Sequence, residues 1–233
     1  MPELVRVKDA FNQRAVQSSD LHDMVGLPRS QGQFDATVVD IARKLNLSAV
    51  DSLIEIGCGN ANLLSSLKPY VRRTVGVDFA FSQLRTARTL LSDGSFVCVQ
   101  ANAIPFPDFS FDRVLCYSVF HHFPDVKYAR RVILELCRLC KPNGLVLVGD
   151  LPDKKVYRKV VSRRWEVVYR LRVLRGRHPG PSIFNPLNWI FFDLAGLARY
   201  VESIGHTANI LNQPPGLIAA DYRRDILIRV RKG

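Results

Sequence analysis

The chain has 233 residues, of which 47% are hydrophobic and 23% charged, and its formal net charge is +12. This size and composition are typical of one soluble globular domain, and no apolar run approaches the roughly 18 residues that a membrane span requires. The mixed N-terminus has no signal-peptide core and predicts a cytoplasmic protein, while the excess of positive charge favours an anionic partner without naming one.

Segments with strand-like and helix-like patterns alternate along the chain. In order, the expected elements are a helix at 35–47, strands at 52–57 and 73–78 with a helix at 62–70 between them, a helix at 82–91, strands at 95–100 and 112–119, a helix at 126–141, a strand at 144–150, a helix at 192–204 and strands at 206–211 and 223–231. This alternation predicts an α/β fold with a parallel sheet covered by helices on both faces. We expect the last two strands to be added at one edge.

Five cysteines fit a reducing compartment. Cys137 and Cys140 form a CxxC pair that would suit a metal or a redox site. We interpret the pair as core residues on one helical face, because no second CxxC completes a zinc site.

The stretch LIEIGCGNANLL, residues 53–64, predicts a ligand-binding turn after the first strand. Gly57 and Gly59 allow a tight turn that a ligand can approach closely, and the next helix offers free amide groups. A dinucleotide oxidoreductase would need a third glycine where Asn62 stands. Glu55 would repel a pyrophosphate but attract a cation. This pattern favours S-adenosylmethionine, which carries a sulfonium and an ammonium and no phosphate.

Two later positions fit the same ligand. Asp78 ends the second strand, where a carboxylate can accept both ribose hydroxyls, although the same residue would also suit a helix N-cap. Asn102 and Ala103 follow the third strand, and we expect them at the adenine edge.

The order EIGCGNA, VGVD, ANAIPFPDFSFDRV, HHFPD and LCKPNGLVLV resembles the class I S-adenosylmethionine-dependent methyltransferases, above all their small-molecule, methyltransferase type 11-like group. The resemblance covers residues 35–150 and continues through 191–211. It implies a Rossmann-like, doubly wound seven-stranded sheet whose last strand is antiparallel, with a helical insertion after the fifth strand. The implied cofactor-binding residues are Glu55, Gly57, Cys58 and Gly59 around the methionine part, Asp78 with Phe79 beside it, Asn102 and Ala103 at the adenine, and Tyr117.

Two residues depart from the family pattern. Ala61 stands where the family often has glycine, and we expect its methyl group to be tolerated. Asn102 stands where the family usually has aspartate, and its amide oxygen can still accept from the adenine amino group, with weaker binding.

His121 and His122 are the candidate catalytic residues. Methyl transfer is an in-line displacement whose rate depends largely on positioning, but a hydroxyl acceptor also needs a base near neutral pH. The resemblance supports this choice, because members that methylate sugar hydroxyls often carry a similar His-His pair. The alternative is that one histidine caps the next helix and the other packs against Phe120 or Phe123. No ligand pattern suggests a divalent metal, so we predict none.

The basic segment 154–177 holds ten lysines and arginines against the single Glu166. Its apolar residues recur at helical spacing, which predicts an amphipathic basic helix. Either it is a solvated surface, or it forms one wall of the acceptor site and attracts an anionic acceptor or an anionic membrane surface. We divide the single domain into an N-terminal cap (1–34), a cofactor-binding core (35–150), this basic insertion (151–191) and the sheet edge (192–233).

The predicted function is a methyltransferase that acts on a hydroxyl or amine of a small-molecule acceptor or a lipid- or glycan-linked one. An RNA methyltransferase is the first alternative, but no RNA-binding module is visible and YSVFHH, residues 117–122, replaces a base-flipping motif, so nucleic acid is the less favoured partner. The second alternative is a non-catalytic binding module of the same fold. The acceptor, the choice of oxygen, nitrogen or carbon as nucleophile, and the oligomeric state stay open.

Overall fold

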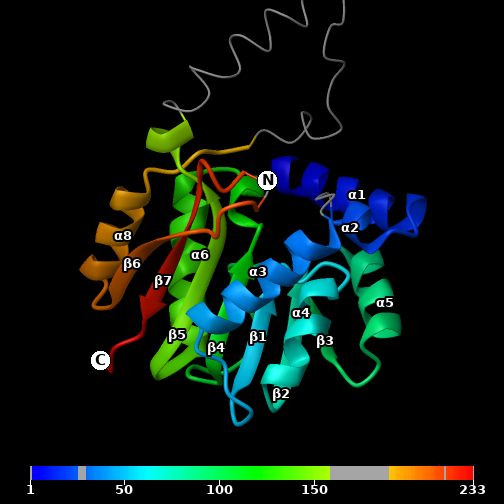
Figure 1. Cartoon of the computed structure of the whole chain (residues 1–233), viewed down its shortest axis with the longest axis horizontal. Coiled ribbons are helices and arrows are strands. Elements are labelled where there is room, and N and C mark those ends of the chain that lie inside the picture. The colour runs from blue at the N-terminus through cyan, green and yellow to red at the C-terminus, as the bar shows by residue number, and fades with distance from the viewer. Residues whose placement is uncertain (1, 26–29, 158–188, 218, 233) are drawn as a thin grey trace, which may run out of the picture.

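The structure, a computed structural model, describes residues 2–25, 30–157, 189–217 and 219–232, and it contains one seven-stranded sheet in the order β3-β2-β1-β4-β5-β7-β6 (Figure 1). The strands are β1 (Ser52–Ile56), β2 (Arg73–Asp78), β3 (Ser95–Cys98), β4 (Phe111–Tyr117), β5 (Cys140–Pro152), β6 (Thr207–Asn212) and β7 (Arg223–Arg229). The helices are α1 (Pro2–Gln17), α2 (Leu21–Met24), α3 (Gln31–Lys44), α4 (Asn62–Leu67), α5 (Phe81–Leu90), α6 (Val126–Leu139) and α8 (Leu194–Ser203), with short 3₁₀ turns η1 (Lys68–Tyr70) and η2 (Phe120–His122).

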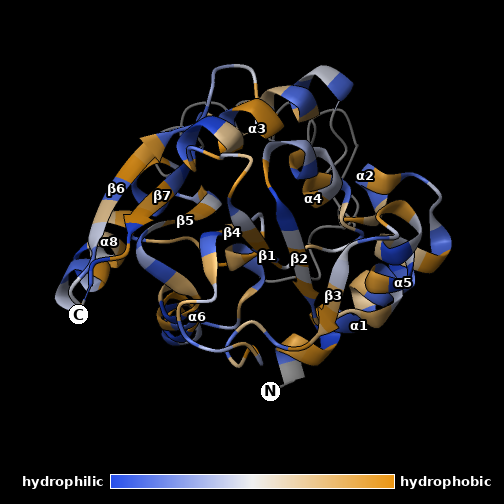
Figure 2. Ribbon diagram, turned by 90° about the horizontal axis from the view of Figure 1, so that it is seen from below, coloured by the Kyte–Doolittle hydropathy of each residue, from blue (hydrophilic) through white to orange (hydrophobic). Residues whose placement is uncertain are grey.

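Strands β1 to β5 run parallel, and β7 runs antiparallel to both β5 and β6. All five residues of β1 are buried, as expected for a central strand covered on both faces. Helices α6 and α8 pack on one face of the sheet, and α3, α4 and α5 pack on the other. Helices α5 and α6 alternate hydrophilic and hydrophobic residues along their length (Figure 2), as a helix that covers one face of a sheet must. The expected fold class is confirmed.

The boundary between α6 and β5 differs from the sequence prediction. The helix ends at Leu139, and Cys140 is already extended and pairs with Phe111 of β4. The shared helical face predicted for Cys137 and Cys140 is therefore wrong, although both thiols are buried. The strand starts early because β4 offers backbone partners there, and a register shift between Phe111 and Arg113 accommodates the extra residues of β5 between Cys140 and Leu145.

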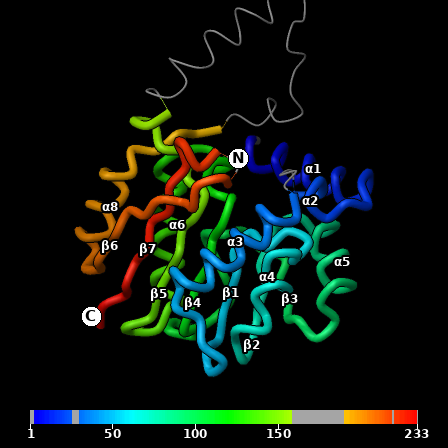
Figure 3. Tube along the Cα trace, viewed as in Figure 1, coloured from blue at the N-terminus to red at the C-terminus, as the bar shows by residue number. Residues whose placement is uncertain are grey.

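The N-terminal segment, residues 2–25, forms α1 and α2, which no sequence pattern had indicated. It lies across the carboxyl ends of the central strands, beside α5, whereas the chain leaves β7 at the opposite end of the sheet (Figure 3). The amide of Ser82 in the first turn of α5 donates to Asn12 Oδ1 at 2.9 Å. Since α5 has no side-chain cap of its own, α1 supplies one from a distance.

Most of the predicted basic helix lies outside the described residues, which stop at 157 and resume at 189. Residues 154–157 are helical. Among the helices that the structure does describe, none combines the length and the apolar run that a membrane crossing needs.

Candidate functional site

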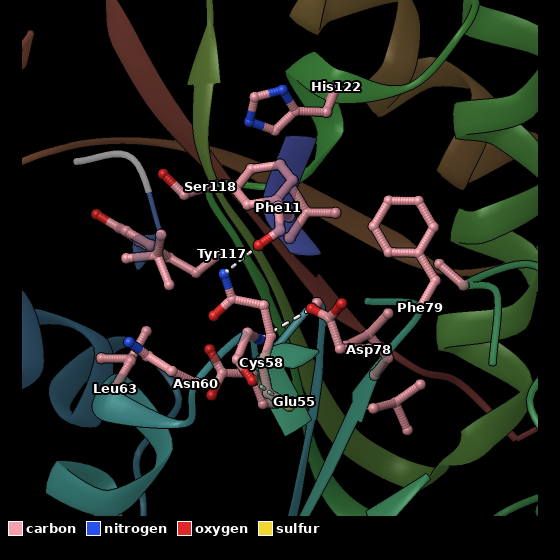
Figure 4. Close-up of a pocket in the computed structure, with 18 of the residues that line it drawn as sticks. Phe11, Glu55, Cys58, Asn60, Leu63, Asp78, Phe79, Tyr117, Ser118 and His122 are labelled. Carbon is pink, nitrogen blue, oxygen red and sulfur yellow. Dashed lines mark hydrogen bonds between the residues drawn. The ribbon is translucent and has the colours of Figure 1, made fainter. Parts of the chain in front are cut away.

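A pocket opens at the carboxyl ends of β1, β2 and β4, under the N-terminal segment. It encloses about 1140 Å³ of space, including solvent at its mouth. Figure 4 shows Glu55 and Asp78 at one end and His122 at the other. Of the eleven residues predicted for the site, eight line the pocket: Glu55, Gly57, Cys58, Gly59, Asp78, Phe79, Tyr117 and His122.

Gly57 and Gly59 shape the turn after β1, and both have positive φ, at 76° and 52°. A Cβ on Gly57 would stand 2.3 Å from a methyl carbon of Val119, and one on Gly59 would stand 2.9 Å from a methyl carbon of Val25. The turn therefore needs glycine for its backbone conformation and for the space above it.

Asp78 stabilises two turns by hydrogen bonds, the turn after β1 and the turn after β2. Its Oδ2 accepts from the amide of Gly59 at 2.9 Å, and its Oδ1 accepts from the amide of Ala80 at 2.8 Å. Burial raises the pKa of Asp78, and the backbone donors of Ala80, Gly59 and Phe79 oppose that rise. The carboxylate faces the pocket, and each oxygen retains a lone pair for a ligand. Its role on the ribose stays a prediction.

Glu55 is buried beside Asp78, with 2% of its surface exposed. Its Oε2 has no hydrogen-bond partner within the described residues. Burial, and the neighbouring charge of Asp78, raise the pKa of Glu55 to about 8. A carboxyl group that is buried, unpartnered and open to a pocket fits a cationic ligand, whose charge would offset the cost of ionising it.

Cys58 is a buried thiol in the same turn. Burial and the charges of Asp78 and Glu55 raise its pKa well above the ordinary value. The thiol stays protonated and serves as a small apolar part of the pocket wall.

Asn102 and Ala103 do not line the pocket, whereas Val99 and Ala101 do. Asn102 Oδ1 accepts from the hydroxyl of Tyr128 at 2.9 Å, and Tyr128 lines the pocket. Asn102 is thus separated from the pocket by the side chain of Tyr128. Direct contact of Asn102 and Ala103 with an adenine stays a prediction.

The structure separates the two histidines. His122 lines the pocket and packs edge-on against Phe11, with ring centroids 5.2 Å apart. His121 is 1% exposed, lies outside the lining and packs against Trp189 at 4.8 Å. Neither caps α6, because Asp125 does so by accepting from the amide of Tyr128.

Both imidazoles are neutral at pH 7. Burial and the charges of Arg223 and Arg14 lower the pKa of His122 to about 3. Burial, followed by the charges of His122 and Arg223, lowers the pKa of His121 well below its usual value. Their Nδ1 atoms have no partner in the described part of the chain.

Ser118 lines the pocket and pairs with Asp150 behind it, a pair that the sequence did not reveal. Ser118 follows β4, lines the pocket and donates its hydroxyl proton to Asp150 in β5. Both have left-handed backbones, with φ of 63° and 62°, and Asp150 forms an ion pair with buried Arg223. Strained backbone at adjoining strand ends is common at functional sites. The only sequence signal was an aspartate at the end of a predicted strand.

A buried polar network extends from Asp150 and includes Tyr117 of the pocket wall. Gln213 Nε2 lies 3.2 Å from Tyr117 Oη, 3.3 Å from Asp150 Oδ1 and 3.1 Å from Asp225 Oδ1. Asp225 in turn accepts from Lys44 Nζ at 2.7 Å. We call Lys44, Asp150, Gln213, Arg223 and Asp225, together with Asp40 on Lys44, the β5–β7 network.

Within the described ranges, no group of three or more histidine, cysteine, aspartate or glutamate side chains is arranged to hold a metal ion.

Residues 54–148 match a protein-family model described as a methyltransferase domain. Over 103 residues the chain is 31% identical to the uncharacterized methyltransferase YcgJ of Bacillus subtilis, a match that covers 42% of this chain and 40% of that protein. It is also 31% identical over 123 residues to the 27-O-demethylrifamycin SV methyltransferase of Amycolatopsis mediterranei, covering 47% and 42% of the two. The chain thus spans less than half the length of these curated relatives.

The fold is similar to that of the N-methyltransferase NodS of Bradyrhizobium japonicum, solved in complex with S-adenosyl-L-homocysteine. The TM-score is 0.65, and the likeness covers 95% of this chain and 97% of that one. Sequence identity is 15%, so this likeness is one of fold.

Proposed function

Because the chain belongs to the class I S-adenosylmethionine-dependent methyltransferases, we propose that it transfers a methyl group from S-adenosylmethionine to a hydroxyl or amine of a small-molecule acceptor. The observation that carries this proposal is the unpartnered oxygen of buried Glu55 in the pocket. A buried acid without a cation is costly in the free protein, and a cationic cofactor supplies the missing charge.

The residues at this end of the pocket fit the cofactor. Glu55 would hold the ammonium of the methionine part and Asp78 the ribose hydroxyls, and Gly57 and Gly59 form the tight turn beside the two acids. Bound there, the cofactor supplies a methyl group already activated by its sulfonium. The protein's own contribution is to exclude water and hold the acceptor in line with that methyl group.

The opposite end of the pocket is the proposed acceptor site. Its walls are mainly apolar and aromatic, including Phe11 and Phe123, and they suit an apolar or flat acceptor. Ser118 and neutral His122 supply hydrogen-bonding groups there. The 27-O-demethylrifamycin SV methyltransferase of Amycolatopsis mediterranei is named for methylation at an oxygen, which supports a hydroxyl acceptor for this chain too. A lipid- or glycan-linked anionic acceptor still rests on the charge of residues 154–177.

Of the two histidines, we propose His122 as the group that accepts the acceptor's proton, because only His122 lines the pocket. With a pKa of about 3 it is neutral but weakly basic, so it acts only on a proton that becomes acidic as the new bond forms. His121 would support the ring of His122 from behind, at a centroid distance of 4.1 Å.

Calorimetry with S-adenosylmethionine and S-adenosyl-L-homocysteine tests the cofactor, with NAD as the control ligand. We expect binding of both sulfur compounds. No heat at high concentration, or a preference for NAD, would refute the proposed function. Incubation of cell extract with a labelled methyl donor, followed by mass spectrometry, then identifies the product.

With that product in hand, His122→Ala and His121→Ala separate the two imidazoles. We expect His122→Ala to lower turnover about 100-fold with unchanged cofactor affinity, and His121→Ala to lower it less. Wild-type turnover in both variants would exclude both imidazoles as the base and favour an acceptor that needs only positioning.

A further inference from the structure

The N-terminal segment forms the roof of the pocket. Five of its side chains, Leu4, Val7, Phe11, His22 and Val25, line the cavity. Side chains of the core hold this roof by its backbone. Asn60 Nδ2 donates to the carbonyl of Leu21 at 2.8 Å, and Gln83 Nε2 donates to the carbonyls of Phe11 at 3.0 Å and Met24 at 2.8 Å. Gln83 is therefore the residue that ties α1 and α2 to α5 together.

The amide of Gln83 has a fixed orientation. Two backbone carbonyls face one end of it, so that end must be the NH₂ group. The other end, Oε1, is buried and has no hydrogen-bond partner among the residues described. The whole residue is 1% exposed and lines the pocket. A buried amide oxygen without a donor is costly, so this atom points to a missing ligand group that donates.

The position of Oε1 indicates which part of a ligand it meets. It lies 3.9 Å from the place where a Cβ on Gly59 would stand, and the amide of Gly59 donates to Asp78. Gln83 also stands in the first turn of α5, directly after the turn that Asp78 fastens. The donor is therefore expected beside Asp78, where the ribose is proposed to lie.

We propose that Gln83 joins the cofactor to the roof: Oε1 accepts a hydrogen bond from a ribose hydroxyl while Nε2 holds Phe11 and Met24. This inference rests on the proposed function. Because a single side-chain amide serves both, a ligand that fixes Oε1 also fixes Nε2 against the roof. Cofactor binding and roof closure then strengthen each other, as reciprocal linkage requires.

The test uses the full chain with S-adenosyl-L-homocysteine, adenosine, 2′-deoxyadenosine and 3′-deoxyadenosine as probes. Calorimetry gives affinities, and hydrogen exchange of the backbone amides of residues 3–24 reports the roof. Gln83→Met removes both contacts at nearly constant size. Gln83→Glu keeps an acceptor oxygen but cannot donate to the two carbonyls. Asn12→Ala is the matched control, because Asn12 holds the roof through Ser82 and does not line the pocket.

For the wild type we expect S-adenosyl-L-homocysteine to slow the hydrogen exchange of the backbone amides in the roof. We also expect a preference for the intact ribose, so that adenosine binds more tightly than at least one deoxy analogue. Gln83→Met should weaken S-adenosyl-L-homocysteine and adenosine by about tenfold, the loss of one hydrogen bond, and abolish both the preference and the added protection. Gln83→Glu should keep the preference and lose the protection. Asn12→Ala should keep the preference.

Four results would overturn the inference. They are wild-type affinity in Gln83→Met, an intact ribose preference in that variant, a loss confined to the homocysteine compound, or no effect of that compound on wild-type exchange. A chain that does not bind S-adenosyl-L-homocysteine at all would instead refute the proposed function. If Gln83→Met is unfolded by circular dichroism, Gln83→Glu and the wild-type probe series decide the question alone.

Discussion

The cofactor end of the pocket and the β5–β7 network both contain buried carboxyl groups near the carboxyl ends of the parallel strands. The two regions differ in whether these carboxyl groups have a cationic partner. In the network, Asp150 pairs with Arg223, and Asp225 and Asp40 pair with Lys44. At the cofactor end, Glu55 and Asp78 lie side by side, and no cation of the described chain pairs with either. Each carboxylate of the network has a cationic partner, whereas neither acid of the pocket has one among the described residues.

The difference teaches which buried charges serve the fold and which serve binding. Removing one partner of a buried ion pair leaves an uncompensated charge and destabilises the protein strongly. Removing an acid that already lacks a partner relieves the free protein and costs affinity for the cation instead. Two substitutions and two measurements of pH dependence test this division, in order of decreasing effect, and a third substitution tests the backbone strain at Ala61.

Lys44→Met should lower the free energy of unfolding by about 3–5 kcal/mol, because it leaves Asp40 and Asp225 buried beside an apolar side chain. Denaturant unfolding measures the loss. Arg43→Met is the matched control, since Arg43 pairs with the same Asp40 but has 74% of its side chain exposed. We expect a loss of no more than about 0.5 kcal/mol there. Equal losses in both variants would show that burial does not distinguish the two pairs.

Glu55→Gln should weaken S-adenosylmethionine by about 10- to 100-fold, or about 1.5–3 kcal/mol, because a charged hydrogen bond to the ligand is lost. The free energy of unfolding at pH 8 should not fall, since the free protein no longer carries a buried, ionisable carboxyl. Calorimetry and denaturant unfolding on one preparation check both values. A variant that binds normally but unfolds more easily would assign Glu55 to the fold.

The pH dependence follows from the pKa of Glu55, raised to about 8 in the free protein. A cationic ligand binds the ionised form, so binding below pH 8 must expel a proton. Affinity should therefore fall by up to tenfold, about 1.4 kcal/mol, for each pH unit below about 8, and this slope should vanish in Glu55→Gln. Calorimetry in buffers with different ionisation heats counts the proton. Affinity that is flat between pH 6 and 8 would contradict the ionisation of Glu55 on binding.

The same raised pKa predicts the stability of the free protein. The folded state holds a proton on Glu55 between about pH 4.5 and pH 8, where the unfolded state has lost it. The contribution of Glu55 is thus fully present below about pH 4.5 and lost as pH rises to about 8. Unfolding curves of wild type and Glu55→Gln should converge at the acid end of this window, and curves that stay parallel would disprove the shift.

Ala61→Gly should have the smallest effect. Ala61 precedes α4 in a left-handed conformation, with φ of 60°, which costs a residue with a Cβ about 1–2 kcal/mol. Glycine relieves that strain but loses a buried methyl group worth about 0.8 kcal/mol. A net gain of about 0.5 kcal/mol in thermal or denaturant unfolding is expected, and a clear loss would mean that packing around the methyl group outweighs the strain.

The sequence predicted the fold because the signals for its strands and helices are local. The strand predicted at 73–78 coincides with β2. Gly57 and Gly59, together with Glu55, correctly indicated the position of the pocket. What it missed depends on side-chain direction or on partners distant along the chain. Adjacent histidines give no sign that only one faces the cavity. Gln83 bonds to residues 59 and 72 positions away, and no periodicity reports such a contact.

The hydrogen bonds that Asp78 accepts from the amides of Gly59 and Ala80 also affect the entropy of ligand binding. Both loops that would meet the ribose are already held in place before a ligand arrives. Their conformational entropy has been lost during folding, so binding need not order them a second time. The pocket floor is preorganised, and replacing Asp78 should make association entropically less favourable even for ligand fragments that never touch its carboxylate.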